Sequence, residues 1–241
     1  MNKLDILVFA AHPDDAELGA GGTIAKEVAL GKKVGVVDLT RGELGTRGTP
    51  EIRAKEAQKA AEILGLAVRE NLGLADGFFE INKESQLSLI QKIRQYQPEI
   101  VLCNAIDDRH IDHGRGSRLA SEACFLSGLR KIETVDPKSG ELQEPWRPKY
   151  VYHYIQWKNI EPDFAVDISG YMDTKMQAIQ AYSSQFFDPN SQEPATPISS
   201  QNFFESVRYR AQDLGRLIGV EHAEGFTTER LPAVDRLEHL Q

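Results

Sequence analysis

Two short segments of this 241-residue chain hold most of the side chains that could bind a metal ion or move protons. Residues 11–15 read Ala-His-Pro-Asp-Asp, and residues 107–113 read Asp-Asp-Arg-His-Ile-Asp-His. Imidazole nitrogens together with a carboxylate oxygen suit zinc, and three protein ligands with one open position are typical of a catalytic zinc site. His12, Asp15 and His113 could supply such a set, and a water in the open position would have its pKa lowered to about 7.

Three neighbouring side chains suit proton transfer and charge stabilisation. Asp14 adjoins a predicted ligand while its side chain diverges from it, so it could accept the proton of an attacking water. His110 lies three residues before His113, and Asp112 could form a hydrogen bond with it and favour its charged form. A histidinium there would stabilise an oxyanion that grows on an attacked carbonyl.

Neither segment is specific by itself. His-Pro-Asp-Asp could be a turn with an aspartate as helix cap, and most His-x-x-His pairs lie on a surface by chance. The positions of the two segments favour a metal site, because each follows a predicted strand. Residues 4–10 (LDILVFA) and 99–104 (EIVLCN) are short apolar runs, as expected of strands buried on both faces.

The elements between these strands predict a parallel sheet. Further strands are expected at residues 33–39 and 67–72, with helical patterns between them, and Thr49-Pro50 is typical of a helix N-terminus. This alternation predicts an α/β fold, a Rossmann-like three-layer sandwich with a mainly parallel central sheet. In a doubly wound sheet of order 3-2-1-4-5, strands 1 and 4 are neighbours, and ligands bind in the crevice where their connections diverge. The two segments are therefore expected to converge on one site.

The second half of the chain is less regular. No internal repeat or convincing linker interrupts it, so residues 1–241 are expected to form a single domain. A long polar loop at residues 188–200 is of the kind that forms a lid or part of a binding site. The remaining expected elements are strands at residues 149–157 and 163–168, and helices at residues 171–184 and 201–217.

Composition argues against several function classes. The net charge is −8 and no broad basic stripe occurs, which argues against a general nucleic-acid binder. No apolar run reaches the length of a membrane span, and the start lacks the basic flank and cleavage site of a signal peptide, so we expect a cytoplasmic protein. The two cysteines, Cys103 and Cys124, are expected to be small buried apolar residues, neither a disulfide nor metal ligands.

The two segments also resemble the signatures of a known family. AHPDDAELGAGGT is similar to the opening signature of the LmbE-like N-acetylglucosaminyl deacetylases, the N-acetylglucosaminyl-phosphatidylinositol de-N-acetylase family, and DRHIDHG is similar to their second signature. Residues 39–49, 168–186 and 220–230 resemble the members of the bacillithiol pathway. Two departures are Ile111, where the family usually has proline, and Ala16, where a larger apolar residue is more common. Neither side chain is expected to bind a metal.

The resemblance implies a zinc-dependent hydrolase that removes the N-acetyl group of an N-acetylglucosamine conjugate. Iron or cobalt could replace zinc, because the same ligands accept several divalent ions. The resemblance implies zinc held by His12, Asp15 and His113, Asp14 as the general base, and His110, oriented by Asp112, as the electrophilic partner.

The bacillithiol-like segments imply N-acetylglucosaminyl malate as the substrate, while chitooligosaccharide, mycothiol-type and antibiotic-precursor substrates stay open. Arginine forks bind carboxylates bidentately. Because similar family members use such arginines on the substrate, Arg53 and Arg109 are predicted to contact sugar hydroxyls or the malate carboxylates. Glu43 and Tyr182 are further candidates from the family-like segments. Similar members assemble, often as hexamers, so a homo-oligomer is expected.

Two other functions compete with this one. A nucleotide-binding dehydrogenase has some support, because Gly19, Gly21 and Gly22 follow the first strand and Asp38 ends the second. A dinucleotide fingerprint, however, needs its glycines at the strand-to-helix turn itself, and here they come nine or more residues later. A non-catalytic zinc- or sugar-binding module would have no use for a free carboxylate at Asp14, so Asp14→Asn separates that function from hydrolysis.

Overall fold

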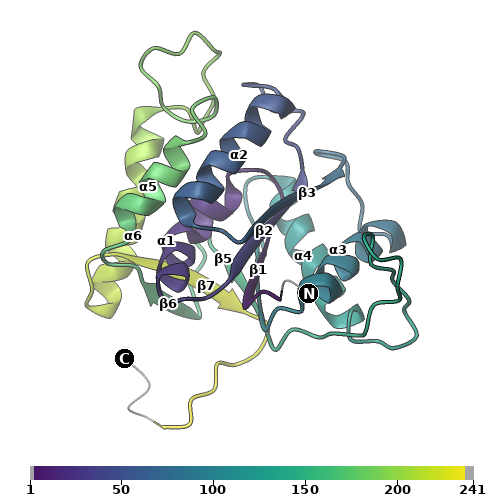
Figure 1. The fold of residues 1–241 in the computed structure, drawn as a ribbon. Coiled ribbons are helices and arrows are strands. Elements are labelled where there is room, and N and C mark those ends of the chain that lie inside the picture. Colours follow the sequence, from purple (N-terminus) through teal and green to yellow (C-terminus); the bar gives the residue numbers. More distant parts are fainter. Residues whose placement is uncertain (1–2, 237–241) are drawn as a thin grey trace.

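The computed structural model describes residues 3–236, and its central feature is one seven-stranded sheet (Figure 1). The strand order is β3-β2-β1-β4-β5-β7-β6. The first five strands in this order are parallel, and β7 runs antiparallel to both of its neighbours. The strands are β1 (Ile6–Ala10), β2 (Val34–Thr40), β3 (Val68–Leu74), β4 (Ile100–Cys103), β5 (Tyr150–Tyr154), β6 (Phe164–Asp167) and β7 (Ala223–Thr228).

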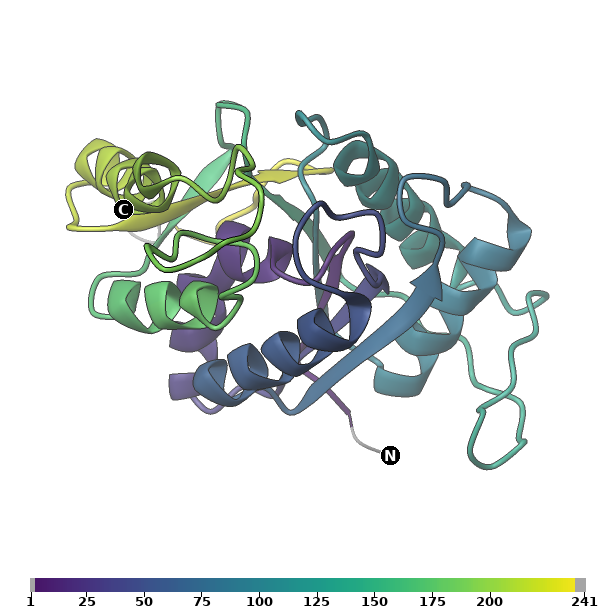
Figure 2. The same ribbon diagram turned by 90° about the horizontal axis from the view of Figure 1, so that it is seen from above.

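Helices cover both faces of this sheet (Figures 1 and 2). Two hydrophobic clusters separate the layers, one under α1, α2, α5 and α6 and the other under α3 and α4. The predicted α/β fold with a mainly parallel sheet between helical layers is therefore confirmed. The helices are α1 (Asp15–Ala29), α2 (Pro50–Leu64), α3 (Lys83–Tyr96), α4 (Ile111–Leu126), α5 (Met172–Gln180) and α6 (Gln201–Ile218).

The apolar runs form the inner strands because both of their faces are covered. Every residue of β1 and β2 is buried, and β1 lies between β2 and β4. Local signals set the helix ends: the Thr49 side chain accepts a hydrogen bond from the Ile52 amide, Pro50 follows it, and Gly65 ends α2 with φ 70°.

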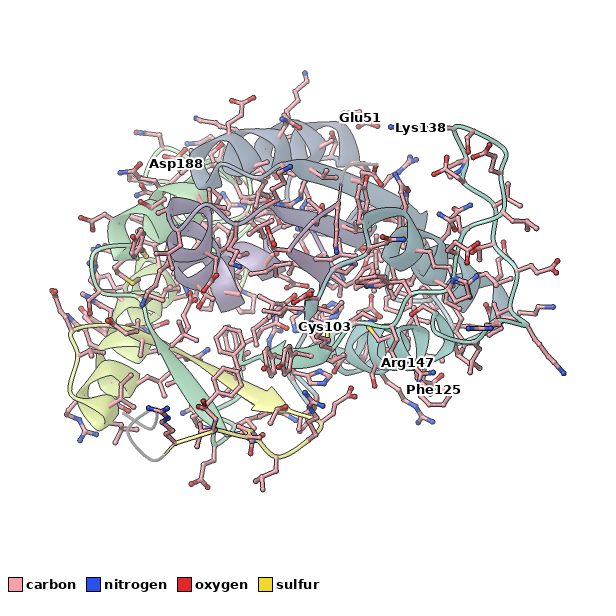
Figure 3. All side chains as sticks on the ribbon, turned by 60° about the horizontal axis from the view of Figure 1, so that its bottom comes forward. Glu51, Cys103, Phe125, Lys138, Arg147 and Asp188 are labelled. Carbon is pink, nitrogen blue, oxygen red and sulfur yellow. The ribbon has the colours of Figure 1, made fainter. Side chains whose placement is uncertain are left out.

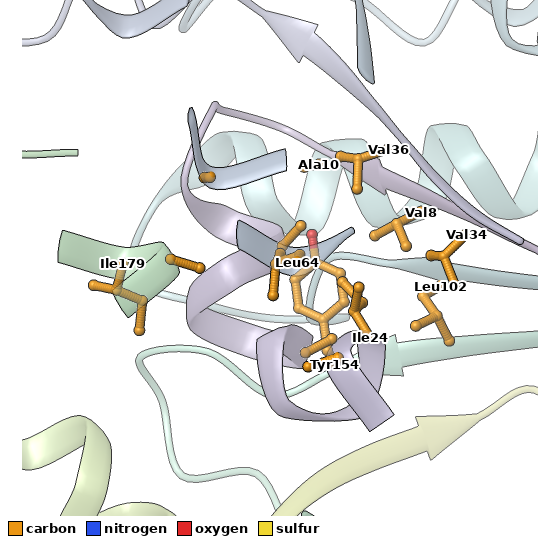
Figure 4. Close-up of a cluster of buried hydrophobic side chains, with 14 of the residues drawn as sticks. Val8, Ala10, Ile24, Val34, Val36, Leu64, Leu102, Tyr154 and Ile179 are labelled. Atoms are coloured by element: carbon orange, nitrogen blue, oxygen red, sulfur yellow. The ribbon is translucent and has the colours of Figure 1, made fainter. Parts of the chain in front are cut away.

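The glycines after the first strand lie inside α1, which excludes the dinucleotide-binding function. Tyr154 packs in the cluster between α1 and the sheet and donates a hydrogen bond to the Phe9 carbonyl at 3.1 Å (Figure 4). A Cβ atom at Gly19 would overlap the Tyr154 ring, and one at Gly22 would overlap Ile168. These glycines allow close packing of a helix, and they do not form a phosphate-binding turn.

The structure differs from the sequence-based expectation in three places. The strand β7 was not predicted, because its sequence AEGFTT is short and carries an inward-facing glutamate. The predicted helix at residues 171–184 ends at Gln180. A helix is predicted from near Gly114 to about Leu129, but α4 starts at Ile111, so His110 is its N-cap residue. That last difference matters for the site described below.

Both cysteines are free and buried, and Figure 3 shows Cys103 in the interior while Glu51, Lys138 and Asp188 lie at the periphery. Within residues 3–236, no helix combines the length and the apolar character that a membrane span needs.

Candidate metal centre

The two chemistry-bearing segments meet because β1 and β4 are paired neighbours in the sheet. His12 follows the end of β1, Asp15 begins α1, and His113 lies in the first turn of α4 after β4. His12 and His113 both approach the same carboxylate: Nδ1 of His12 lies 3.5 Å from Oδ2 of Asp15, and Nε2 of His113 lies 3.1 Å from Oδ1. The structure thus brings the three predicted metal ligands together.

The Asp15 carboxylate is fixed by residues that carry no local motif. Asn104 donates from Nδ2 to Oδ2 of Asp15 at 3.0 Å, and Gln156 donates from Nε2 to Oδ1 at 2.8 Å. The backbone amide of His12 donates to Oδ2 at 2.9 Å. Sequence reasoning missed Asn104 and Gln156, although both lie at the carboxyl ends of predicted strands, which was the one signal available.

The ring nitrogens that point away from Asp15 are each held by carboxylates. Nε2 of His12 lies 3.0 Å from Asp76 and 3.3 Å from Asp112. Nδ1 of His113 lies 2.5 Å from Asp108. Metal-binding histidines almost always have such a partner on the second nitrogen, which fixes the tautomer and ring orientation. This arrangement leaves the nitrogens that face Asp15 as the donors that His12 and His113 could offer to a divalent metal.

Within residues 3–236, the predicted set of His12, Asp15 and His113 is not among the groups whose donor atoms all lie within 4.8 Å of one another. Donor atoms of His12, His110 and His113 all lie within 4.8 Å of one another, and the same holds for His12, Asp76 and Asp112. His110 therefore competes with Asp15 as third donor. Asp15 is favoured because it contacts both other ligands.

The acids at this site favour positive charge on two of its histidines. Burial of His12 lowers its pKa, but hydrogen bonds to Asp112, Asp15 and Asp76 outweigh this and raise the pKa well above its usual range. Burial likewise opposes the charging of His113, but Asp15 and Asp108 raise its pKa to about 9. We name the group His12, Asp14, Asp15, Asp76, Asp108, His110, Asp112 and His113 the pocket cluster. The carboxylates of the pocket cluster stabilise protonated histidines. A divalent metal bound at the same place would supply that positive charge instead.

Asp14 is held beside this group in a strained conformation. Its φ of 117° lies in the left-handed region, which is rare for a residue other than glycine and typical of functional sites. Arg53, from the first turn of α2, binds the Asp14 carboxylate at 2.9 Å and also donates to the Pro13 carbonyl. Burial raises the pKa of Asp14 to about 7, although the Arg53 charge opposes this. Such a carboxylate can take up and release a proton near neutral pH.

His110 and Asp112 do not form the predicted side-chain pair. His110 caps α4, so its Nδ1 accepts a hydrogen bond from the Asp112 backbone amide at 3.2 Å. The Asp112 carboxylate instead faces His12, the Gly77 amide and Arg115. Burial, together with the charges of His12 and His113, lowers the pKa of His110. Burial and the neighbouring histidines thus disfavour the histidinium expected from sequence, although the charges of Asp15 and Asp112 oppose this.

A pocket of about 560 Å³ opens over the pocket cluster. Among the predicted substrate-binding residues, Arg53 and Arg109 line it, whereas Glu43 and Tyr182 do not. The Glu43 carboxylate accepts from the Asp76 amide at 2.9 Å and so positions that loop. Glu43 and Tyr182 therefore lie outside the lining of this pocket, and their substrate contacts stay predictions. The opposite wall is largely apolar and includes Leu18, Ile155, Trp157, Ile198, Phe203, Val207 and Leu214.

Tyr182 lies behind α1 in a second buried polar group. Its hydroxyl donates to Glu17 at 3.1 Å and accepts from Arg69 at 2.9 Å. Arg69 also binds Glu17 at 2.6 Å and both oxygens of Asp38 at 2.8 and 2.9 Å. We call these four residues the Arg69 network. They are buried, and none of them lines the pocket.

Curated relatives give this geometry a context. The chain is 31% identical to a diacetylchitobiose deacetylase of Thermococcus kodakarensis over 92% of this chain and 81% of that protein. It is 31% identical to a 4-oxalmesaconate hydratase of Pseudomonas putida over 74% of this chain and 73% of that protein. It is 27% identical to a probable N-acetyl-alpha-D-glucosaminyl L-malate deacetylase of Bacillus anthracis, over 77% and 83% of the two chains.

Among solved structures, the conserved protein TT1542 from Thermus thermophilus superimposes with a TM-score of 0.85 at 38% identity, over 97% of this chain and 98% of that chain. Residues 7–124, which include both chemistry-bearing segments, match the family described as GlcNAc-PI de-N-acetylase, PIG-L. The fold, the pocket cluster and these matches agree: the chain belongs to the PIG-L family of GlcNAc-PI de-N-acetylases.

Proposed function

We propose that this protein hydrolyses the N-acetyl group of an N-acetylglucosamine conjugate, with a divalent metal held by His12, Asp15 and His113. The observation that carries the proposal is that both histidines face one carboxylate while their outer nitrogens are bound by Asp76, Asp112 and Asp108. Two nitrogens and a carboxylate oxygen are a donor set that zinc accepts, and iron or cobalt would fit the same ligands. Bound there, the metal would supply Lewis acidity toward an amide carbonyl and a water.

The proton transfers fall to Asp14. Its carboxylate accepts a proton from the attacking water and returns it to the leaving amine. Arg53 keeps that carboxylate in place through the 2.9 Å ion pair. The raised pKa of about 7 matches a group that must both take and give a proton near neutral pH.

His110 stabilises the negative charge that grows on the carbonyl oxygen. Because its Nδ1 accepts a hydrogen bond from the Asp112 amide, the proton of the neutral ring resides on Nε2. That N–H group can donate to an oxyanion without a charged imidazole. Asp112 therefore acts on His110 through its backbone, and its carboxylate orients the metal ligand His12.

N-acetylglucosaminyl malate is the substrate that we favour. The likeness of residues 39–49, 168–186 and 220–230 to bacillithiol-pathway members supports it, as does the Bacillus anthracis relative. The Thermococcus relative supports a chitobiose-type substrate instead. A cytoplasmic location, a homo-oligomer and a single domain over residues 1–241 stay predictions.

A second candidate is hydration of an unsaturated dicarboxylate. It is favoured by one observation, the 31% identity to a 4-oxalmesaconate hydratase. Both reactions add water with the help of a base, so the pocket cluster alone does not separate them.

The test is an assay of the purified protein, stripped with a chelator and then supplied with zinc. Release of free amine is followed with N-acetylglucosaminyl malate, N-acetylglucosamine and diacetylchitobiose, and loss of 4-oxalmesaconate by its absorbance. We expect zinc-dependent release that is fastest with the malate conjugate. Turnover of 4-oxalmesaconate alone would replace the proposal with the hydratase.

Asp14→Asn provides the matched control, because it keeps the size of the side chain and the metal ligands. We expect kcat to fall by about 10²–10⁴-fold, the usual contribution of a general base, with metal content unchanged. A protein that binds the sugar conjugate and zinc, yet turns over nothing with or without this substitution, would be a binding module.

A further inference from the structure

Two arginines at the rim of the pocket lack a carboxylate partner. Arg109 follows β4, and its guanidinium lies 4.7 Å from the centre of the Trp157 ring. Arg210 comes from α6 and donates to the Trp157 carbonyl at 2.8 Å. Both line the pocket, and within residues 3–236 neither forms an ion pair. Most of their N–H donors therefore remain available to a ligand.

The nearby acids cannot neutralise them. Asp108 uses one oxygen to accept from the Lys158 amide at 2.8 Å and the other to hold His113. Asp107 pairs with the Lys158 ammonium at 2.7 Å. Partial burial lowers the pKa of Arg210, and the charge of Asp108, which forms no ion pair with it, opposes this. A half-buried cation without a counter-charge is costly, so an anion at this rim would be stabilised.

The other cations of the pocket are already neutralised. Arg53 binds Asp14, and Lys175 binds the buried Glu224 at 2.5 Å. This changes the expectation from sequence, which named Arg53 as a contact for substrate carboxylates. The Arg53 guanidinium donates to Asp14 and to two backbone carbonyls. Arg210 is therefore better placed to bind a substrate carboxylate.

Arg109 and Trp157, whose carbonyl binds Arg210, each adjoin a residue of the reacting centre along the chain. Arg109 directly precedes His110, and Trp157 directly follows Gln156, which holds Asp15. A group bound between Arg109 and Arg210 would therefore lie beside an amide placed over the pocket cluster.

We propose that Arg109 and Arg210 form a subsite for an anionic group on the aglycone of the sugar conjugate, a carboxylate or a phosphate. Guanidinium forks bind both kinds of oxyanion bidentately, and the Trp157 ring holds the Arg109 fork in place. The subsite rests on the proposed deacetylase function, and it explains how a protein of net charge −8 would select an anionic substrate.

The test compares three substrates that share the N-acetylglucosamine unit. N-acetylglucosaminyl malate carries carboxylates, N-acetylglucosamine 1-phosphate carries a phosphate, and the methyl glycoside is neutral. We expect at least one anionic substrate to have a kcat/KM at least tenfold above that of the neutral one. The preferred anion identifies the chemistry of the aglycone. A protein that prefers the methyl glycoside overturns the subsite and leaves the deacetylase function standing.

Arg210→Gln should lower the ratio of anionic to neutral kcat/KM at least tenfold, mainly through KM, and Arg210→Lys should restore part of it. Arg208→Gln is the matched control, since Arg208 lies on the same helix but pairs with Asp173 outside the pocket. We expect it to keep the ratio. An unchanged ratio in Arg210→Gln would refute the subsite.

A direct binding measurement separates the subsite from the reaction. Malate and inorganic phosphate are titrated into the zinc-loaded wild type and Arg210→Gln by calorimetry. Binding of one of them that weakens at least tenfold in the variant supports the subsite, even if no substrate is deacetylated. Equal binding to both proteins, or no binding to either, contradicts it.

Discussion

The pocket cluster and the Arg69 network are both buried groups of acidic side chains, and they differ in how their charges are balanced. In the Arg69 network, one guanidinium reaches Glu17, both oxygens of Asp38 and the Tyr182 hydroxyl. In the pocket cluster, the fixed cations are Arg53 on Asp14 and Arg115 on Asp112. Asp15, Asp76 and Asp108 are left to histidines, which are cationic only when protonated.

This difference separates a structural charge network from a site that needs a ligand. A buried acid with a permanent cation is satisfied by the fold itself. A buried acid that faces histidines gains its counter-charge from protons or from a metal. The predictions below test that contrast in order of expected effect.

The largest effect is expected when the pocket cluster loses its shared carboxylate. Asp15→Asn keeps the shape but removes the charge that both histidines face, so metal and activity should be lost together. Metal content by mass spectrometry and kcat on the malate conjugate check this. A variant that keeps its metal, while His110→Ala loses it, would show that His110 is the third ligand.

Arg69→Met tests the opposite case. It leaves Glu17 and Asp38 buried without their cation, so the free energy of unfolding should fall by about 3–5 kcal/mol. Denaturant unfolding measures this, and metal content should not change. Arg216→Met removes an exposed pair with Asp213 and should cost less than about 1 kcal/mol. Equal losses of unfolding free energy in Arg69→Met and Arg216→Met would mean that burial does not make the Arg69 ion pairs more important for stability.

A smaller effect is expected for the partner of a metal ligand. Asp108→Asn weakens the hold on Nδ1 of His113, and such partners are worth about 10–100-fold in metal affinity or activity. Zinc titration against a chelating dye measures the affinity. Asp107→Asn changes the neighbouring residue, which pairs with Lys158, and should leave the zinc affinity within about twofold. Similar losses of zinc affinity in Asp108→Asn and Asp107→Asn would mean that any nearby negative charge has this effect.

The smallest effect is expected for an ion pair that is only partly buried, Lys92 with Glu70. Although burial opposes it, Lys92 and Tyr96 hold the pKa of Glu70 below its usual 4.5. A depressed folded-state pKa contributes stability above pH 4.5 that is lost as the pH falls through the folded pKa. The stability gap between wild type and Glu70→Gln should therefore narrow between pH 7 and pH 4 in urea unfolding. A stability gap that widens as the pH falls would show that folding raises the pKa of Glu70.

Much of the fold followed from local patterns. The buried runs of β1, β2 and β4 and the caps of α2 are signals within a few residues of one another. The strand order then places the ends of β1 and β4 side by side, so His12, Asp15 and His113 could be expected to meet. The strand β7 escaped prediction because a buried glutamate interrupts its apolar pattern.

The sequence by itself determined the chemistry-bearing residues and the sheet edge where they gather, because residue type and strand periodicity are local properties. Only the tertiary structure decided which partners complete them. Asp76 reaches His12 from 64 residues away, and Gln156 reaches Asp15 from 141 residues away. Arg210 lines the pocket from α6 while Arg53 is paired with Asp14, and the Tyr182 hydroxyl meets Arg69 outside the pocket. Such pairings depend on where loops and helices pack in space, and no spacing along the chain records that.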